Sequence, residues 1–282
     1  MVLVMTMLVV SIFLLIGCAF AYSAGVQRRA ALNAVRELER DCAALSALNY
    51  ARAIIEADAA TGDVDTLDEH WAARDLTVEV GGVACTIRIE DEEQRLNVNL
   101  AVQAPQDPER TPDLRPALRA LIRAAGGCDQ DFDAIVSAIQ PDRPIPLISA
   151  LRAVPGLDPR LFESSPTKPA LDELLATHAR QVNLNTAAET VLEALWGPTG
   201  PVKSVLERRA AQPFRAKMDI ERFLDSIGAP EDVRRTLPLL DVRSEFFRVY
   251  VVPAGALPGG ALEALVHRTG DRAEVLWVRP AG

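Results

Sequence analysis

Histidine and cysteine, the side chains that most often supply nucleophiles, general bases and soft metal ligands, are scarce in this sequence. The chain of 282 residues has only 3 His and 4 Cys. No HExxH, GxSxG or P-loop pattern surrounds the histidines, which lie far apart at His70, His178 and His267. We therefore predict that the protein is not an enzyme and that each histidine is a surface or packing residue.

The four cysteines form no CxxC pair, a spacing that zinc sites and thioredoxin-type redox motifs use. Cys18 lies in an apolar segment, and Cys42 follows in the next stretch of chain. If the rest of the chain lies outside the cytoplasm, Cys85 and Cys128 can form a disulfide. Free buried thiols are the alternative, because connectivity cannot be read from a sequence.

Basic residues are outnumbered by acidic ones. The 30 Lys and Arg against 39 Asp and Glu give a formal net charge of −9. Attraction to phosphate backbones or to anionic lipid needs a basic surface. We therefore expect no nucleic acid among the partners of this protein.

Charge is absent altogether from residues 1–27. This apolar run exceeds the roughly 20 residues that cross a bilayer as a helix. It is longer than the roughly 7–15 apolar residues of a signal peptide, and no basic segment precedes it. We predict a transmembrane or filament-core helix over residues 1–27, with a cleaved signal peptide as the alternative.

The predicted helix continues beyond the apolar run. No Pro or Gly interrupts residues 27–60, where apolar side chains recur at helical spacing. At about 1.5 Å per residue, the whole helix is a rod of roughly 90 Å. A rod that is apolar all round in its first half and amphipathic in its second suits a filament subunit. An ordinary membrane anchor followed by a stalk helix is the alternative.

The positive-inside rule conflicts with an extracytoplasmic body. Arg28 and Arg29 follow the apolar run and nothing basic precedes it, which predicts that the carboxyl-terminal part is cytoplasmic. A basic leader ahead of Met1 would remove this conflict.

The rest of the sequence predicts strands on both sides of a helical block. Residues 76–90 alternate around Gly81-Gly82, which is typical of a hairpin with a two-residue turn. Strand patterns return at 244–252, 261–269 and 273–280. Helical patterns occupy 113–125, 131–139, 147–154, 171–180, 187–195, 202–211, 218–226 and 230–237.

Strands on both sides of such a block must pair with each other to cover their edges. The sequence therefore predicts an α+β fold, in which a long amino-terminal helix packs on a small antiparallel sheet and a large all-α domain is inserted between strands. The predicted divisions are residues 1–27 for the membrane helix, 28–102 with 240–282 for the α+β domain, and 103–239 for the inserted helical domain.

Four motifs follow the long helix in a fixed order. They are DEEQRLNVNL at 91–100, PLISALRAVPGL at 146–157, RQVNLNTAAETVLEA at 180–194 and DVRSEFFRVY at 241–250. Together they resemble, along nearly the whole chain, the minor pseudopilin K family of type II secretion systems (general secretion pathway protein K). The match is incomplete, because Ala150 stands where the family has Glu before Leu-Arg.

Polar residues in these motifs are predicted to have structural roles. Asn183, Asn185 and Thr186 carry short side chains that accept from free helix amides, so we expect them to cap the helix that follows. Asn97 and Asn99 are expected to bond main-chain groups where the chain leaves the first hairpin.

The resemblance implies that prepilin peptidase removes a short basic leader, so that Met1 is the first mature residue. Other pseudopilins usually carry Glu at the fifth mature position, whereas the K type lacks it, and this chain has Met5. That fits a tip subunit, because the topmost subunit has no amino terminus ahead of it to neutralise. The implied partners are the minor pseudopilins I and J. The implied location is the bacterial inner membrane, crossed once, with the soluble part in the periplasm and later at the pseudopilus tip.

The resemblance also implies calcium in the helical domain, near an acidic D-W-I-D-x-D segment. Here the corresponding stretch is VSAIQPDRP, with the single acid Asp142. Asp129, Asp131 and Asp133 have an alternating spacing that can surround a hard cation, although no Gly or distal Glu completes an EF-hand. These four aspartates are our calcium candidates, and helix capping is the alternative for them.

Two other functions compete with the pseudopilin interpretation. Residues 191–209 resemble a helix-hairpin-helix, which grips DNA phosphates through turn amides and basic side chains, here Lys203, Arg208 and Arg209. The net charge favours a hairpin that serves packing alone. A minor pilin of a type IV pilus shares the long helix but not the large helical insert. The sequence thus favours a non-catalytic minor pseudopilin that caps the pseudopilus tip and helps to initiate its assembly.

Overall fold

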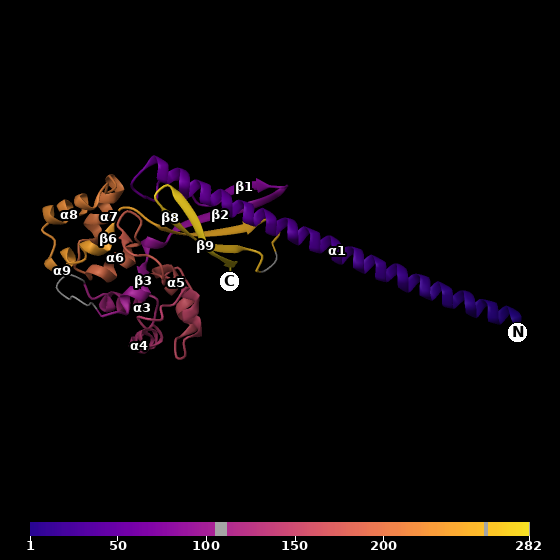
Figure 1. Ribbon diagram of the computed structural model, residues 1–282. Helices are drawn as coiled ribbons and strands as arrows, with labels where there is room; N and C mark the ends of the chain where they lie inside the picture. The colour runs from indigo at the N-terminus through magenta and orange to yellow at the C-terminus, as the bar shows by residue number, and fades with distance from the viewer. Residues whose placement is uncertain (105–111, 257–258, 282) are drawn as a thin grey trace.

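One helix runs from the amino terminus across the whole sheet. The computed structural model describes residues 1–104, 112–256 and 259–281. Helix α1 (Val2–Thr61) is continuous over 60 residues, as the unbroken pattern predicts. Its amino-terminal half projects alone from the folded head (Figure 1). By length and composition it can cross a membrane, and none of its most apolar stretch is buried within the chain.

The head contains a five-stranded antiparallel sheet, whose strands come from both sides of the helical block in the sequence. Its strands are β1 (Leu76–Val80), β2 (Val83–Asp91), β7 (Phe246–Pro253), β8 (Leu262–Thr269) and β9 (Arg272–Pro280), hydrogen-bonded in that order. Each neighbouring pair is antiparallel. The pairing of β2 with β7 joins strands from opposite ends of the soluble sequence, which confirms the predicted α+β fold.

The first hairpin turns at the two glycines that the sequence places there. Val80 pairs with Val83, so Gly81 and Gly82 alone form the turn, with φ of +58° and +81°. Positive φ at both central positions matches the right-handed twist of the flanking strands, and glycine adopts it without steric cost. The predicted two-residue hairpin is confirmed.

Short helices and turns fill the sequence between β2 and β7. The α-helices are α2 (Val98–Ala101), α3 (Arg115–Ala124), α4 (Asp129–Ala138), α5 (Leu171–Leu174), α6 (Glu189–Trp196), α7 (Val202–Ala211), α8 (Lys217–Ser226) and α9 (Glu231–Arg234). Two short parallel strand pairs also lie in this part of the chain. They are β3 (Leu96–Asn97) with β4 (Leu175–Ala176), and β5 (Val182–Asn183) with β6 (Leu240–Asp241).

Three predicted helices are shorter or different. The helix expected over 171–180 ends at Leu174, because Leu175 pairs with Leu96 in a strand. The segment expected over 147–154 forms a 3₁₀-helix at Ile148–Ala153. The last expected helix stops at Arg234 and is followed by the 3₁₀ turn Leu237–Leu239, whose central proline cannot donate a backbone bond.

The head contains two separate hydrophobic cores. In the first, α1 packs on the sheet through small side chains that allow the helix to approach closely: Ala43, Ala44, Ala47 and Ala51, against Ile87, Phe247 and Val249 among others. The second core lies within the helical block. Leu96 and Val102 belong to this second core, although the predicted division between domains lies after residue 102. The limits of the domains stay a prediction.

Candidate functional site

A buried polar cluster joins the two cores. Asp91 ends β2, Asn183 belongs to β5, and Ser244 lies just before β7; all three are fully or almost fully buried. The amide of Asn183 donates to Ser244 Oγ at 2.8 Å and to the carbonyl of Asp65 at 3.2 Å. Ser244 Oγ donates to Asp91 Oδ2 at 2.7 Å, and Thr186 Oγ1 donates to the same oxygen. This cluster ties the helical block to the sheet.

The acids of the cluster are strongly perturbed by burial. Burial raises the pKa of Asp91 to about 6, even though Ser244 and Thr186 donate to its carboxylate. Burial and the neighbouring charge of Asp91 raise the pKa of Glu93 to about 9, while the backbone N–H of Glu245 donates to Glu93 at 2.6 Å. Glu93 is therefore protonated at neutral pH, so the two acids do not repel each other there as two full charges.

These contacts correct the predicted cap. Helix α6 begins at Glu189 after Ala188, with no side-chain hydrogen bond at its start. Asn183 does bond nearby backbone, since its Oδ1 accepts from the N–H of Asn185 at 3.0 Å, but Asn183 and Thr186 also reach residues distant in sequence, as described above. Asn185 forms a pair of bonds with one distant residue: it donates to the carbonyl of Phe214 at 3.0 Å and accepts from its N–H at 2.9 Å.

Asn97 and Asn99 bond main-chain groups where the chain leaves the sheet. Asn97 caps α2 by accepting from the N–H groups of Asn99 and Leu100, and its amide donates to the carbonyl of Ala179. Asn99 exchanges two bonds with the backbone of Ile145, at 2.9 Å each. These bonds hold the loops of the helical block against its first turn.

Sequence reasoning missed Asp91 and Ser244 as members of the cluster. Both stand inside motifs that the sequence singles out, at 91–100 and 241–250. The signal available was a polar residue at the end of a strand or just before one in each motif, but nothing local identifies its partner.

The four calcium candidates do not come together. Asp129 pairs with Arg119 at 3.2 Å and Arg123 at 3.0 Å. Asp131 accepts from the N–H of Cys128 at 2.8 Å, which is a capping contact, while Asp133 and Asp142 are exposed. Among the described residues, the only carboxylate oxygens that converge as a possible ion site belong to three different acids, Asp58, Asp65 and Glu69. Calcium in the helical block stays a prediction.

The cysteines are all free in the described chain. Cys85 is buried in the core between α1 and the sheet, whereas Cys128 precedes α4 in the helical block. The alternative of a free buried thiol thus holds for Cys85, whereas Cys128 is free but exposed.

Two of the three basic residues in the hairpin of α6 and α7 donate to backbone carbonyls of the chain. Arg209 donates to the carbonyls of Leu184 at 3.0 Å and Ala187 at 2.7 Å. Lys203 lies 3.8 Å from Glu207, and Arg208 donates to the carbonyl of Gln212. The contacts of Arg209 are those of a hairpin that packs, whereas the side chain of Lys203 is 91% exposed.

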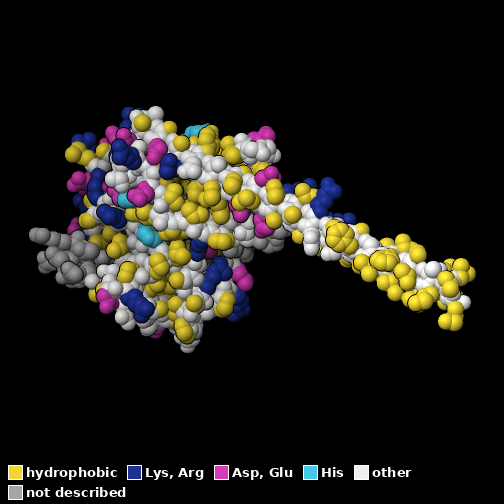
Figure 2. Space-filling model, turned by 45° about the vertical axis from the view of Figure 1, so that its right-hand side comes forward, with side chains coloured by type: hydrophobic (Ala, Val, Ile, Leu, Met, Phe, Trp, Pro, Cys, Tyr) yellow, Lys and Arg dark blue, Asp and Glu magenta, His cyan; other side chains and the backbone are white. Residues whose placement is uncertain are grey.

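Helix α1 offers a long apolar surface outside the two cores. Figure 2 shows hydrophobic side chains along the whole projecting part and basic side chains where it meets the head. On the amphipathic part, Val35 and Leu38 are more than half exposed, at 53% and 63%. In water such a surface is costly, so it is suited to lipid or to the helix of another subunit.

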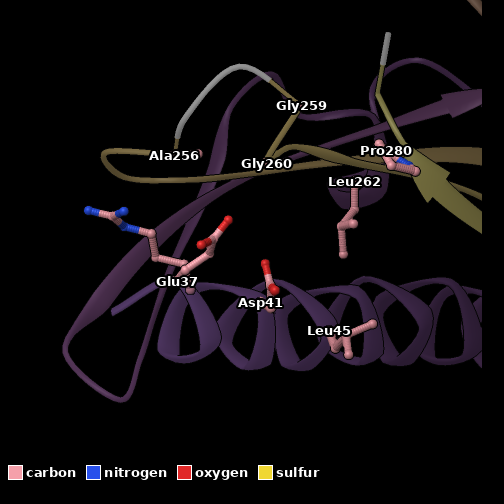
Figure 3. A pocket seen from close by; sticks show the side chains of 9 residues that line it. Glu37, Asp41, Leu45, Ala256, Gly259, Gly260, Leu262 and Pro280 are labelled. Atoms are coloured by element: carbon pink, nitrogen blue, oxygen red, sulfur yellow. The ribbon is translucent and has the colours of Figure 1, made fainter. Parts of the chain in front are cut away.

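A pocket of about 440 Å³ lies where α1 passes the edge of the sheet. Glu37, Asp41 and Leu45 of α1 face Leu262 and Pro280 across it (Figure 3). It brings together no nucleophile and base, and it is continuous with the exposed face of α1. Its shape and lining fit a contact surface.

The similarity of this chain to a known protein lies in its overall architecture. A crystal structure of the GspK–GspI–GspJ complex of the type 2 secretion system from enterotoxigenic Escherichia coli contains a chain that superposes with a TM-score of 0.70. The superposition covers 91% of this chain and 99% of that chain. The fold is GspK-like.

The sequences share only 17% of their residues, so the likeness establishes the GspK-like fold and nothing finer. No protein-family model matches the chain. No curated protein matches its sequence. The GspK-like fold has both features that the sequence predicted from its strand and helix patterns, the long helix on an antiparallel sheet and the helical block between β2 and β7.

Proposed function

We propose that this chain is a non-catalytic minor pseudopilin of a type II secretion system, positioned at the tip of the pseudopilus, where it helps to initiate assembly. The observation that carries this proposal is the GspK-like fold, with its exposed apolar helix, over 91% of the chain. In this role the apolar half of α1 lies in the inner membrane before assembly, crossing it once, and the head lies in the periplasm.

The position of the helical block supports a place at the tip. The block lies at the end of the molecule opposite to the amino terminus of α1 (Figure 1). Subunits of a helical filament stack along their long helices, so a bulky block at the far end of the head obstructs a further subunit. A polar cluster fixes that block to the sheet, which makes the obstruction rigid.

The exposed apolar face of α1 supports partners that also carry a long apolar helix. We propose that the minor pseudopilins I and J of the same system pack against this face and the adjoining pocket. The side chains of Val35 and Leu38 supply apolar area there, each buried methylene contributing about 0.8 kcal/mol on transfer from water. Prepilin peptidase is the proposed processing enzyme, with Met1 as the first mature residue.

The test is co-expression of the full chain with the cognate I and J subunits. A charge on the apolar face, as in Val35→Asp or Leu38→Asp, should abolish copurification and reduce secretion, because a buried unpaired carboxylate is costly at an interface. Leu67→Asp is the matched control: Leu67 is 53% exposed, lies away from this face between α1 and β1, and should copurify normally. Equal copurification of all the variants would refute the proposed interface.

Processing is tested on protein from native membranes. Mass spectrometry of the amino-terminal peptide should give a methylated Met1. An unmethylated start with an intact longer sequence ahead of it would contradict processing by prepilin peptidase and favour a permanent anchor.

A further inference from the structure

Three carboxylates converge where α1 ends. Asp58 belongs to the last turns of α1, and Asp65 and Glu69 lie in the segment between α1 and β1. One carboxylate oxygen of each lies within 4.8 Å of the others. No histidine or cysteine takes part, so the group offers only hard oxygen ligands.

One cation faces these three acids. Arg268 of β8 is almost fully buried; it donates to Asp58 Oδ2 at 3.0 Å and also to Asp65 Oδ2. With all three acids ionised, a single guanidinium leaves two negative charges uncompensated. Burial and the charges of Glu69 and Asp65 accordingly raise the pKa of Asp58 to about 6, against the opposing effect of Arg268. Burial also raises the pKa of Glu69.

A buried oxygen in the same group has no partner. Asp65 is only 1% exposed, and its Oδ2 accepts from the N–H of Ser244 at 2.7 Å as well as from Arg268. Its Oδ1 is buried and has no hydrogen-bond partner among the described residues. Buried carboxylate oxygens without a partner are rare in folded proteins, because removing them from water is costly. This oxygen is the part of the structure that points to a missing ligand.

The group is reachable from solvent. A pocket of about 530 Å³ is lined by Asp58, Thr61 and Glu69, together with Trp71. Asp58 and Glu69 thus face this pocket, whereas Asp65 is buried.

We propose that Asp58, Asp65 and Glu69 bind a divalent cation, with Ca²⁺ as the ion that fits best. The oxygens that Arg268 leaves free on Asp58 and Asp65 supply ligands, and Glu69 completes a partial set that water fills. Zinc prefers nitrogen and sulfur ligands. Magnesium demands a strict octahedron, whereas calcium accepts 6–8 oxygens in an irregular arrangement, at roughly 10⁻⁴–10⁻³ M affinity in extracytoplasmic modules.

Such an ion would fasten three parts of the head. Asp58 represents α1, Asp65 bonds the N–H of Ser244 at the entry to β7, and Arg268 belongs to β8. Binding to the folded state alone raises stability by mass action. The ion would therefore strengthen the contact between the long helix and the sheet, at a place distinct from the aspartates of the helical block.

Terbium luminescence provides a readout at this site. The indole N–H of Trp71 donates to Glu69 Oε2 at 2.7 Å, so Tb³⁺ bound here lies next to a tryptophan that can sensitise its emission. We expect the full chain in detergent, stripped with a chelator, to give saturable Tb³⁺ emission that Ca²⁺ displaces. We also expect Ca²⁺, but not NaCl of equal ionic strength, to raise Tm.

Single substitutions test which carboxylates bind the ion. Asp58→Asn and Glu69→Gln should each weaken Ca²⁺ binding at least about tenfold, since each removes one of the three carboxylates. Asp63→Asn, exposed in the same segment, and Asp129→Asn in α4 should bind as the wild type does. A cooperative thermal transition in chelator shows that each variant is folded.

The inference would be overturned if the wild type gave neither saturable Tb³⁺ emission nor a calcium-dependent rise in Tm, or if folded Glu69→Gln had unchanged affinity. Loss of binding in Asp129→Asn alone would move the ion to the helical block and equally overturn it. None of these outcomes depends on copurification with other pseudopilins, so this inference and the proposed function stand or fall separately.

Discussion

Replacing Glu93 by Gln should remove much of the pH dependence of folding. Glu93 is buried between Asp91 and Glu245, and its pKa is raised to about 9 by burial and by the charge of Asp91. In the unfolded chain the pKa of the same carboxyl lies near its ordinary value of 4.5. Between these two values the folded state holds a proton that the unfolded state has released, so the contribution of Glu93 to stability is fully present below about pH 4.5 and is lost as pH rises toward 9.

The size of the effect follows from the proton difference. One proton of difference lowers the free energy of unfolding by about 1.4 kcal/mol for each pH unit. From about pH 6.5 to about pH 8.5 the expected loss is therefore roughly 2–3 kcal/mol. This range lies above the pKa of about 6 of Asp91, whose own contribution is largely complete by then.

The assay is urea unfolding of the full chain in detergent, followed by tryptophan fluorescence at several pH values in that range. Glu93→Gln mimics the protonated acid, so its free energy of unfolding should be nearly constant and should exceed that of the wild type at the alkaline end. Glu79→Gln, on an exposed position of β1, should keep the slope of the wild type. A parallel slope in Glu93→Gln and the wild type would show that Glu93 is ionised in the folded protein and refute the reasoning.

Two further substitutions test the packing described above. Asn183→Ala removes the donor to Ser244 and Asp65 and should lower the free energy of unfolding by roughly 1–3 kcal/mol, measured by denaturant titration, because it leaves buried groups without partners; a change below about 0.5 kcal/mol, typical of surface sites, would contradict that role. Ala51→Leu should cost about 1–3 kcal/mol by overfilling the contact of α1 with the sheet, whereas Ala53→Leu, on the exposed face, should leave Tm nearly unchanged.

Local signals in the sequence predicted the elements that local physics determines. The continuity of α1 follows from a stretch of apolar and helix-forming residues with no Pro and only Gly17 and Gly25 in it, and the first hairpin follows from Gly81-Gly82. The order of strands and helices then predicted the insertion, since β2 needs a partner and the next long strand is β7.

Long-range contacts were beyond such reasoning. The sequence favoured Asn183 as a local cap, but its partners Asp65 and Asp91 lie 118 and 92 residues away. Short polar side chains serve caps and buried clusters equally well, and only the tertiary fold decides between them. The helix expected over 171–180 failed for the same reason, because the pairing of Leu175 with Leu96 overrode the local helical pattern.

The polar cluster explains how two cores can act as one body. The chain leaves the sheet after Asp91 and returns to it after Ser244, and a hydrogen bond joins these two residues at 2.7 Å. An apolar contact between the cores would tolerate sliding, whereas a network of directional bonds is satisfied in one arrangement only. Asp65, in the segment after α1, accepts from the N–H of Ser244 at 2.7 Å and so links the end of the helix to this cluster. In the proposed role at the tip of a pseudopilus, these bonds would hold the block and the helix at a fixed angle to each other.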